Sequence, residues 1–204
     1  MPLTNQLQEP KKTLKRLQSE QSILLAAQHL FAEKGFAATT SKEIAYSSGL
    51  AEGLIFRYFK DKKGLLRQIM LNWFEKNLTE LTALPQDNNN VTNELTILTT
   101  WIFNSYSNNL DLHKIALATK LNNNFHTEFE TECNNYVDQR RTIIYERLLV
   151  HQQNLQLRQD LDIQCLYEII QSYAMTSALF LNVKPEQQAK AIKEFINILI
   201  KGLY

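Results

Sequence analysis

A scarcity of helix-breaking residues is the feature that most limits what this chain can fold into. The 204 residues include only five glycines and four prolines. Apolar residues recur three and four positions apart along most of the chain, which is the spacing of a helix with one buried face. We therefore predict an all-α fold of about nine helices. The expected helices cover about 19–34, 41–48, 52–58, 62–83, 92–109, 112–121, 127–154, 163–182 and 186–202.

Local signals predict where the first four helices begin and end. Gly35 follows the first helix, where a glycine commonly takes the left-handed conformation that ends a helix. Thr40 and Glu43 have the spacing of a capping box, which predicts that the second helix begins after Thr40. Gly49 predicts the turn after that helix, and Asp61 is placed to cap the fourth helix.

The charges divide the chain into unlike parts. Residues 1–64 carry ten Lys and Arg against six Asp and Glu, whereas residues 65–204 carry twelve against fifteen. A basic segment is typical of a part that faces a polyanion. We predict a basic arm over 1–18, flexible at first and helical towards its end. A DNA-binding domain over 19–66 and a second helical domain over 67–204 complete the expected organisation.

Composition and motifs exclude several classes of protein. Cys133 and Cys165 are the only cysteines and form no CxxC pair, so we expect neither a disulfide framework nor a metal site. No secretory signal and no apolar run of membrane-spanning length occurs, which indicates a cytoplasmic protein without membrane association. Metalloprotease, nucleophile-elbow, P-loop and dinucleotide fingerprints are also missing, so we expect no enzyme and no cofactor.

Two short helices joined at Gly49 indicate a helix-turn-helix, whose second helix enters the major groove of DNA. In that second helix, Ile55 and Phe59 share the side expected to be buried. The opposite side offers Gly53 and Arg57 among other residues. Spacing alone leaves a second interpretation open, namely a pair of helices inside an ordinary bundle with a solvated lysine face.

The segment from 23 to 66 resembles the N-terminal domain of the TetR/AcrR family of transcriptional regulators. The resemblance rests on LFAEKGF at the end of the first helix, TTSKEIA at the capping box and SGL at the turn. It continues with GLIFRYF in the third helix and KKGLL at the start of the fourth. These spacings agree with the family without an insertion. The remaining 140 or so residues are similar to the family only in length and helical content.

This resemblance implies a set of DNA contacts, with Lys62 placed to contact phosphate. The positions implied are Thr40, Ser41, Lys42, Glu52, Gly53, Leu54, Arg57, Tyr58 and Lys62. Three residues depart from the family pattern. Ala51 replaces a common capping serine, Glu52 stands where lysine is frequent, and Phe56 stands where tyrosine is usual. The departures predict altered base preference or a weaker grip on the DNA backbone.

The resemblance also implies that the second domain forms a homodimer and binds a small molecule. The predicted dimer interface comprises Ile163, Leu166, Ile170, Ala174, Ile192, Phe195, Ile196 and Leu199. Two-fold symmetry would match a palindromic operator in double-stranded DNA. The predicted ligand-binding residues are Trp101, Phe103, Tyr106, His113, Phe125, Tyr136, Tyr167 and Tyr173. An inducer bound there would release a repressor from DNA through the fourth helix, by favouring one conformer. The alternative is a helical ligand-binding or interaction protein that keeps the fold without specific DNA binding.

Overall fold

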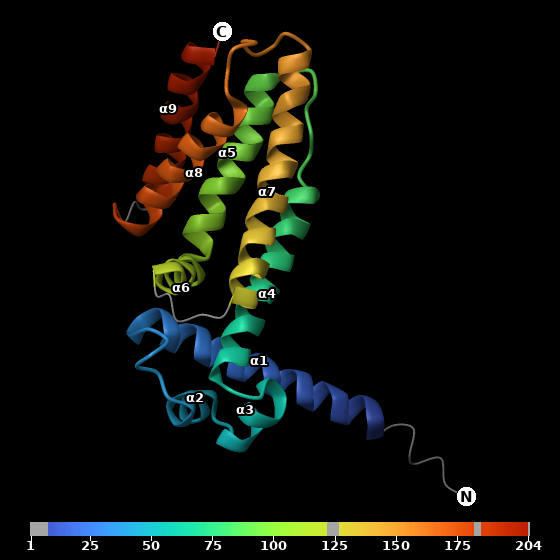
Figure 1. The fold of residues 1–204 in the computed structure, drawn as a ribbon, viewed down its shortest axis with the longest axis vertical. Helices are drawn as coiled ribbons and strands as arrows, with labels where there is room; N and C mark the ends of the chain where they lie inside the picture. The colour runs from blue at the N-terminus through green and yellow to red at the C-terminus, as the bar shows by residue number, and fades with distance from the viewer. Residues whose placement is uncertain (1–7, 122–126, 182–184, 204) are drawn as a thin grey trace, which may run out of the picture. The chain divides into compact units, whose positions relative to one another are not determined.

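The computed structural model describes residues 8–121, 127–181 and 185–203, and most of these residues are helical (Figure 1). No strand occurs in these ranges, so the predicted all-α fold is confirmed. The helices are α1 (Gln8–Lys34), α2 (Ser41–Ser48), α3 (Glu52–Phe59), α4 (Lys62–Thr82), α5 (Val91–Asn108), α6 (Leu110–Leu121), α7 (Thr127–Gln153), α8 (Ile163–Leu179) and α9 (Pro185–Leu203). The largest departure from the predicted bounds is the start of α1, at Gln8 rather than near Ser19. The helix therefore includes much of the predicted arm.

The chain divides into two compact units, each with its own buried residues. Unit 1 comprises Met1–Trp73 and Lys114–Asn123, and unit 2 comprises Phe74–His113 and Asn124–Tyr204. The helix α4 contributes residues to both units. The predicted domain boundary after residue 66 therefore lies inside this helix.

Unit 1 is built on packing of α1 against α2 and of α2 against α3. Gly35 and Gly49 have φ angles of 83° and 68°, so both adopt the left-handed conformation expected of helix-terminating glycines. The first residues of α4 are held by Asp61, whose Oδ1 accepts a hydrogen bond from the Gly64 amide at 2.7 Å. The predicted ends of these helices are thereby confirmed.

Unit 2 is organised around α5, which packs against α7, α8 and α9. A buried ion pair joins two of these helices, because Arg147 Nε of α7 donates to Glu94 Oε1 of α5 at 2.5 Å. The same guanidinium donates to the carbonyl oxygen of Pro85 at 2.6 Å. Removing one partner of such a buried pair costs about 3–5 kcal/mol, so this contact fixes α7 against α5.

Six of the eight residues predicted to form the dimer interface lie in the core of a single chain, which corrects the prediction for those six. Ile163, Leu166, Ile170, Ala174, Ile192 and Ile196 are buried in the core of unit 2, and Phe195 and Leu199 pack against it. The most apolar face of each helix is used inside the chain, because that burial is needed for folding. A different face of α8 is exposed and uncharged, and it carries Cys165, Ile169, Ser172 and Thr176, with Phe180 just beyond the helix.

Candidate functional site

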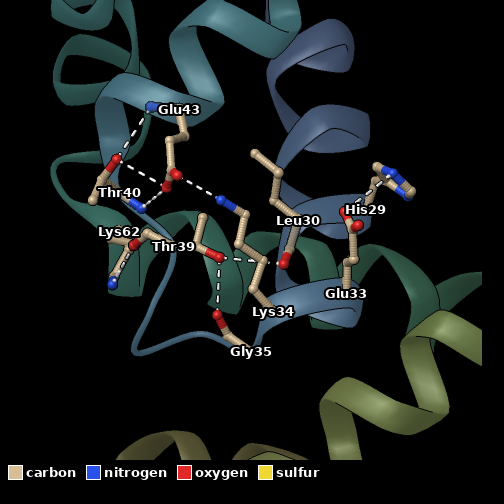
Figure 2. A network of polar contacts seen from close by, with 9 residues as sticks. All are labelled: His29, Leu30, Glu33, Lys34, Gly35, Thr39, Thr40, Glu43 and Lys62. Carbon is tan, nitrogen blue, oxygen red and sulfur yellow. Dashed lines mark hydrogen bonds and ion pairs between the residues drawn. The ribbon is translucent and has the colours of Figure 1, made fainter.

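A capping box fixes the start of α2, as the sequence predicts. The Glu43 amide donates to Thr40 Oγ1 at 3.2 Å, and Glu43 Oε2 accepts from the Thr40 amide at 2.9 Å. Lys34 Nζ from the end of α1 donates to Glu43 Oε1 at 2.5 Å (Figure 2). The hydrogen bond from Lys34, followed by those from Thr40, lowers the pKa of Glu43 to about 2. Glu43 therefore stays ionised at neutral pH and ties α1 to the start of the helix-turn-helix.

Lys62 braces the connection between α1 and α2, a role that the sequence did not predict, and its contact with phosphate stays a prediction. Its Nζ donates to the carbonyl oxygens of Phe36 and Thr39, each at 2.7 Å. The ammonium also lies 4.4 Å from the centroid of the Phe36 ring, within cation–π range. Burial lowers the pKa of Lys62. These contacts leave the ammonium facing inward, towards the connection that leads into α2.

Helix α3 presents one side to solvent and buries the other. Ile55 and Phe59 are buried, whereas Gly53 and Arg57 are exposed, which confirms the predicted sidedness of this helix. No heavy atom of the described residues lies within 4 Å of the position that a Cβ on Gly53 would take. Glycine is a poor helix former, and nothing in the fold requires it here. The open space at Gly53 therefore favours close approach by a partner outside the chain.

The remaining predicted contact residues differ in exposure. Ser41, Glu52 and Leu54 are half-buried, and Thr40 and Lys42 are exposed. The N-cap residue of α3 is Ala51, which makes no side-chain capping hydrogen bond, because alanine has no hydroxyl or carboxylate to accept one.

Arg57 and Tyr58 interact with each other and with the basic extension of α1. Arg57 Nη2 donates to the Tyr58 hydroxyl at 2.8 Å, and its guanidinium lies 4.8 Å from the Tyr58 ring centroid. The guanidinium of Arg16 lies 5.5 Å from the same ring and is also paired with Glu20. Two arginines from different helices therefore gather at one tyrosine beside the exposed side of α3.

Two further aromatic side chains of unit 1 are exposed. Tyr46 on α2 is 92% exposed, and Phe56 on α3 is 49% exposed. Sequence reasoning noted Phe56 only as a departure from the family and missed Tyr46 altogether. Ile44 and Ala45 are the buried residues of this short helix, which leaves the next position outside.

The predicted ligand-binding residues separate into two clusters within unit 2. Rings of Phe103, Tyr173 and Phe195 form an apolar group, with Tyr173 stacked on Phe195 at a centroid distance of 4.6 Å. Phe195 was predicted to lie in the dimer interface. Its ring instead contacts two residues that were predicted to bind the ligand. Trp101 is buried in the same core, and Phe125 lies outside the described residues.

The second cluster is polar and centres on an arginine that sequence reasoning missed. Tyr106 stacks on His113 with centroids 3.9 Å apart. Arg140 of α7 is buried, and its guanidinium carbon lies 5.8 Å and 5.9 Å from the ring centroids of Tyr136 and Tyr167. Burial and the nearby positive charge of Arg140 lower the pKa of His113 to about 3, so this imidazole is neutral at pH 7.

The parts of the chain that the structure describes hold no candidate metal site and no membrane-spanning helix. There, no group of three or more His, Cys, Asp or Glu side chains gathers in a way that could hold a metal ion. Among the same residues, no helix has the length and apolar character needed to cross a bilayer.

Helices α1 to α3, with an outward-facing α3, define this chain as a helix-turn-helix protein. Residues 23–69 match the family model described as bacterial regulatory proteins of the tetR family. Over these residues the chain is similar to the DNA-binding part of the tetR family, in agreement with the resemblance seen in the sequence.

Two relatives from Bacillus subtilis (strain 168) share the N-terminal region. The HTH-type transcriptional regulator YvkB is 48% identical over 48 residues, which are 24% of this chain and 25% of that protein. The HTH-type transcriptional regulator YerO is 31% identical over 70 residues, which are 34% of this chain and 24% of that protein. The matched segment thus spans about a quarter of the length of these relatives.

Solved structures extend the likeness in fold to most of the chain. A tetR-family regulatory protein from Rhodococcus RHA1 superposes with a TM-score of 0.75 at 17% identity, covering 91% of this chain and 96% of that one. PfmR from Thermus thermophilus gives 0.72 at 16% identity, with 89% and 95% covered. FadR from Bacillus subtilis, solved in complex with stearoyl-CoA, gives 0.64 at 20% identity, with 90% and 99% covered.

Proposed function

We propose that this chain binds double-stranded DNA through unit 1, as a transcriptional regulator that acts in the cytoplasm. The observation that carries the proposal is the outward side of α3, backed by buried Ile55 and Phe59, with the guanidiniums of Arg57 and Arg16 at the Tyr58 ring. A helix exposed in this way, as the second of a helix-turn-helix, fits the major groove.

The predicted contact residues divide by the chemistry they offer to DNA. In this proposal Arg57 and Leu54 meet base edges, and Gly53 lets the backbone approach closely. Glu52 can accept a hydrogen bond from a cytosine amino group, although it repels phosphate. Phosphate contacts are assigned to Ser41, Lys42 and Tyr58 together with the capping residue Thr40. In this proposal Lys62 acts indirectly, by holding the connection that leads into α2.

We place the homodimer contact on the exposed uncharged face of α8. Cys165, Ile169, Ser172 and Thr176 recur at helical spacing, and a self-complementary contact between two copies suits a two-fold axis. A symmetric dimer would set two copies of α3 roughly 34–36 Å apart, which is one turn of DNA, and would select a palindromic operator.

Unit 2 is the part that we expect to bind a small-molecule inducer. One solved neighbour, FadR from Bacillus subtilis, holds stearoyl-CoA, which supports a ligand-binding role for this fold. We propose that the chain is a repressor and that ligand binding favours a conformer with weaker operator affinity. The loss of operator affinity that the ligand causes cannot exceed the ratio of the ligand's affinities for the two conformers.

The test begins with selection of an operator from randomised DNA duplexes by the purified chain, followed by anisotropy titrations at several salt concentrations. Arg57→Ala is expected to weaken operator binding about tenfold or more. Lys42→Met is expected to reduce the slope of log affinity against log salt by about one unit. Lys76→Met, which removes an exposed lysine of unit 2, is the matched control and should leave the slope unchanged.

Two outcomes would contradict the proposal. One is enrichment of no sequence in the selection, which would favour a helical interaction protein with the same fold. The other is an equal change of salt slope for Lys42→Met and Lys76→Met, which would mean that unit 1 makes no specific phosphate contacts.

A further inference from the structure

Five side chains of unit 2 from four helices meet around one buried guanidinium. We call them the Arg140 cluster: Tyr106 of α5, His113 of α6, Tyr136 and Arg140 of α7, and Tyr167 of α8. All five are buried. Arg140 lies beside the Tyr136 and Tyr167 rings and influences the ionisation of His113. The cluster is therefore a polar centre inside a largely apolar unit.

The positive charge of Arg140 has no carboxylate partner among the described residues of unit 2. The ion pairs there use other cations: Arg141, Arg147, Arg158, Lys76 and Lys190. Arg147, two turns further along α7, shows the usual arrangement of a buried arginine, which is an ion pair with a buried carboxylate. Its partner is Glu94. Burying an unpaired cation is strongly unfavourable, so Arg140 calls for a counter-charge.

The groups around Arg140 offer hydrogen-bond donors. Its own Nε is buried and makes no hydrogen bond to the described residues. Burial raises the pKa of Tyr136 to about 12, so this phenol keeps its proton at neutral pH. The imidazole of His113 is uncharged at neutral pH, because its pKa is lowered to about 3. The cluster thus combines one positive charge with phenol donors.

We propose that the Arg140 cluster binds the carboxylate of an otherwise apolar organic acid. A guanidinium offers two parallel N–H groups that match the two oxygens of a carboxylate. A doubly charged phosphate would leave one negative charge without a partner, because Arg140 is the only cation of the cluster. The apolar body of the acid is matched by nearby rings, since Phe74 stacks on Tyr136 with centroids 4.1 Å apart. This site deepens the proposed function by giving the inducer a chemical class, and its regulatory role rests on that function.

The test measures thermal unfolding of the full chain without DNA, at constant ionic strength, in the presence of benzoate or octanoate. Benzyl alcohol and octanol are the neutral probes of matched size. The wild-type chain should be stabilised by at least one acid and less by the corresponding alcohol. In Arg140→Met the stabilisation by the acid should be lost, with the dissociation constant raised at least about tenfold. Arg158→Met makes the same change at an exposed arginine and should bind the acid as the wild type does.

The unfolding temperature of the free variants separates a ligand site from a structural role. Methionine replaces the guanidinium of Arg140 with an apolar group of similar length, so the free Arg140→Met chain should be as stable as the wild type or more stable. Arg147→Met should unfold at a lower temperature, because it leaves Glu94 buried without its partner.

Several results would overturn the proposal. These are equal stabilisation by acids and alcohols, no stabilisation by either acid, retention of the acid effect in Arg140→Met, or a loss of stability in the free Arg140→Met chain as large as that in Arg147→Met. All these measurements are made without operator DNA. A failure here is therefore distinguishable from a failure of the DNA-binding proposal.

Discussion

Replacing Lys62 with methionine tests whether this residue holds unit 1 together or only reaches towards DNA. The variant keeps a long apolar side chain beside Phe36 but removes the ammonium. Two short hydrogen bonds of 2.7 Å, to the carbonyl oxygens of Phe36 and Thr39, are lost with it. A longer one of 3.4 Å to the carbonyl oxygen of Ala37 is lost as well.

The size of the effect follows from these contacts. A hydrogen bond to a charged group contributes about 1.5–3 kcal/mol, which sets an upper range of about 3–6 kcal/mol for the two short bonds. Water can reach the half-buried site and solvate the carbonyl groups in the variant, and removing the buried charge recovers its desolvation cost. We therefore expect a net loss of about 2 kcal/mol. For a chain of this size that corresponds to a fall in Tm of roughly 4–8 °C.

Thermal unfolding followed by circular dichroism measures this loss in the absence of DNA. Lys63→Met is the matched control, because Lys63 is an exposed neighbour and its loss should change stability by less than about 0.5 kcal/mol. Equal unfolding temperatures for Lys62→Met and Lys63→Met would refute the bracing role. They would return Lys62 to the expected function of a surface phosphate contact.

Further predictions concern the glycines of unit 1 and two groups with shifted pKa values. Gly64→Ala should lower the free energy of unfolding, measured in urea, by about 1–3 kcal/mol, because the added methyl group would overlap the Phe59 carbonyl oxygen. Gly53→Ala places its methyl group in open space and should be at least as stable as the wild type. Glu43 has a folded pKa of about 2 against an unperturbed 4.5, so it stabilises the fold above pH 4.5, and that contribution is lost as the pH falls towards 2. Glu43→Gln should therefore show a smaller fall in Tm over that range, and an unchanged slope would contradict the ion pair with Lys34. His113 has a folded pKa of about 3 against 6.5, so the unfolded chain takes up its proton first and stability falls as the pH drops from 6.5 towards 3. His113→Gln should flatten that fall in Tm, and the same fall in both proteins would mean that the imidazole is solvated.

The fold was largely predictable because its signals are local. The capping pair Thr40–Glu43, the glycines at 35 and 49, and Asp61 act within a few residues of where they stand, so their spacing in the sequence suffices. The start of α1 was missed because the polar segment before Ser19 shows no apolar face.

The sites were less predictable because they depend on contacts between distant residues. Lys62 reaches carbonyl groups more than twenty positions earlier in the chain, and nothing near it in sequence indicates this. The apolar faces of α8 and α9 marked burial correctly, but a sequence does not say whether a second copy or the same chain covers such a face. Arg140 was overlooked because an arginine in a helix is usually exposed, and only the fold shows it enclosed by tyrosines.

Reading of bases by α3, twice per dimer, is tested most directly by repeating the selection from randomised duplexes with the Arg57→Ala variant. We expect a palindromic sequence for the wild type. In the variant, base preference should be relaxed at one position in each half-site and kept elsewhere. The same consensus for both proteins, with every base preference retained, would contradict a role for α3 in the groove.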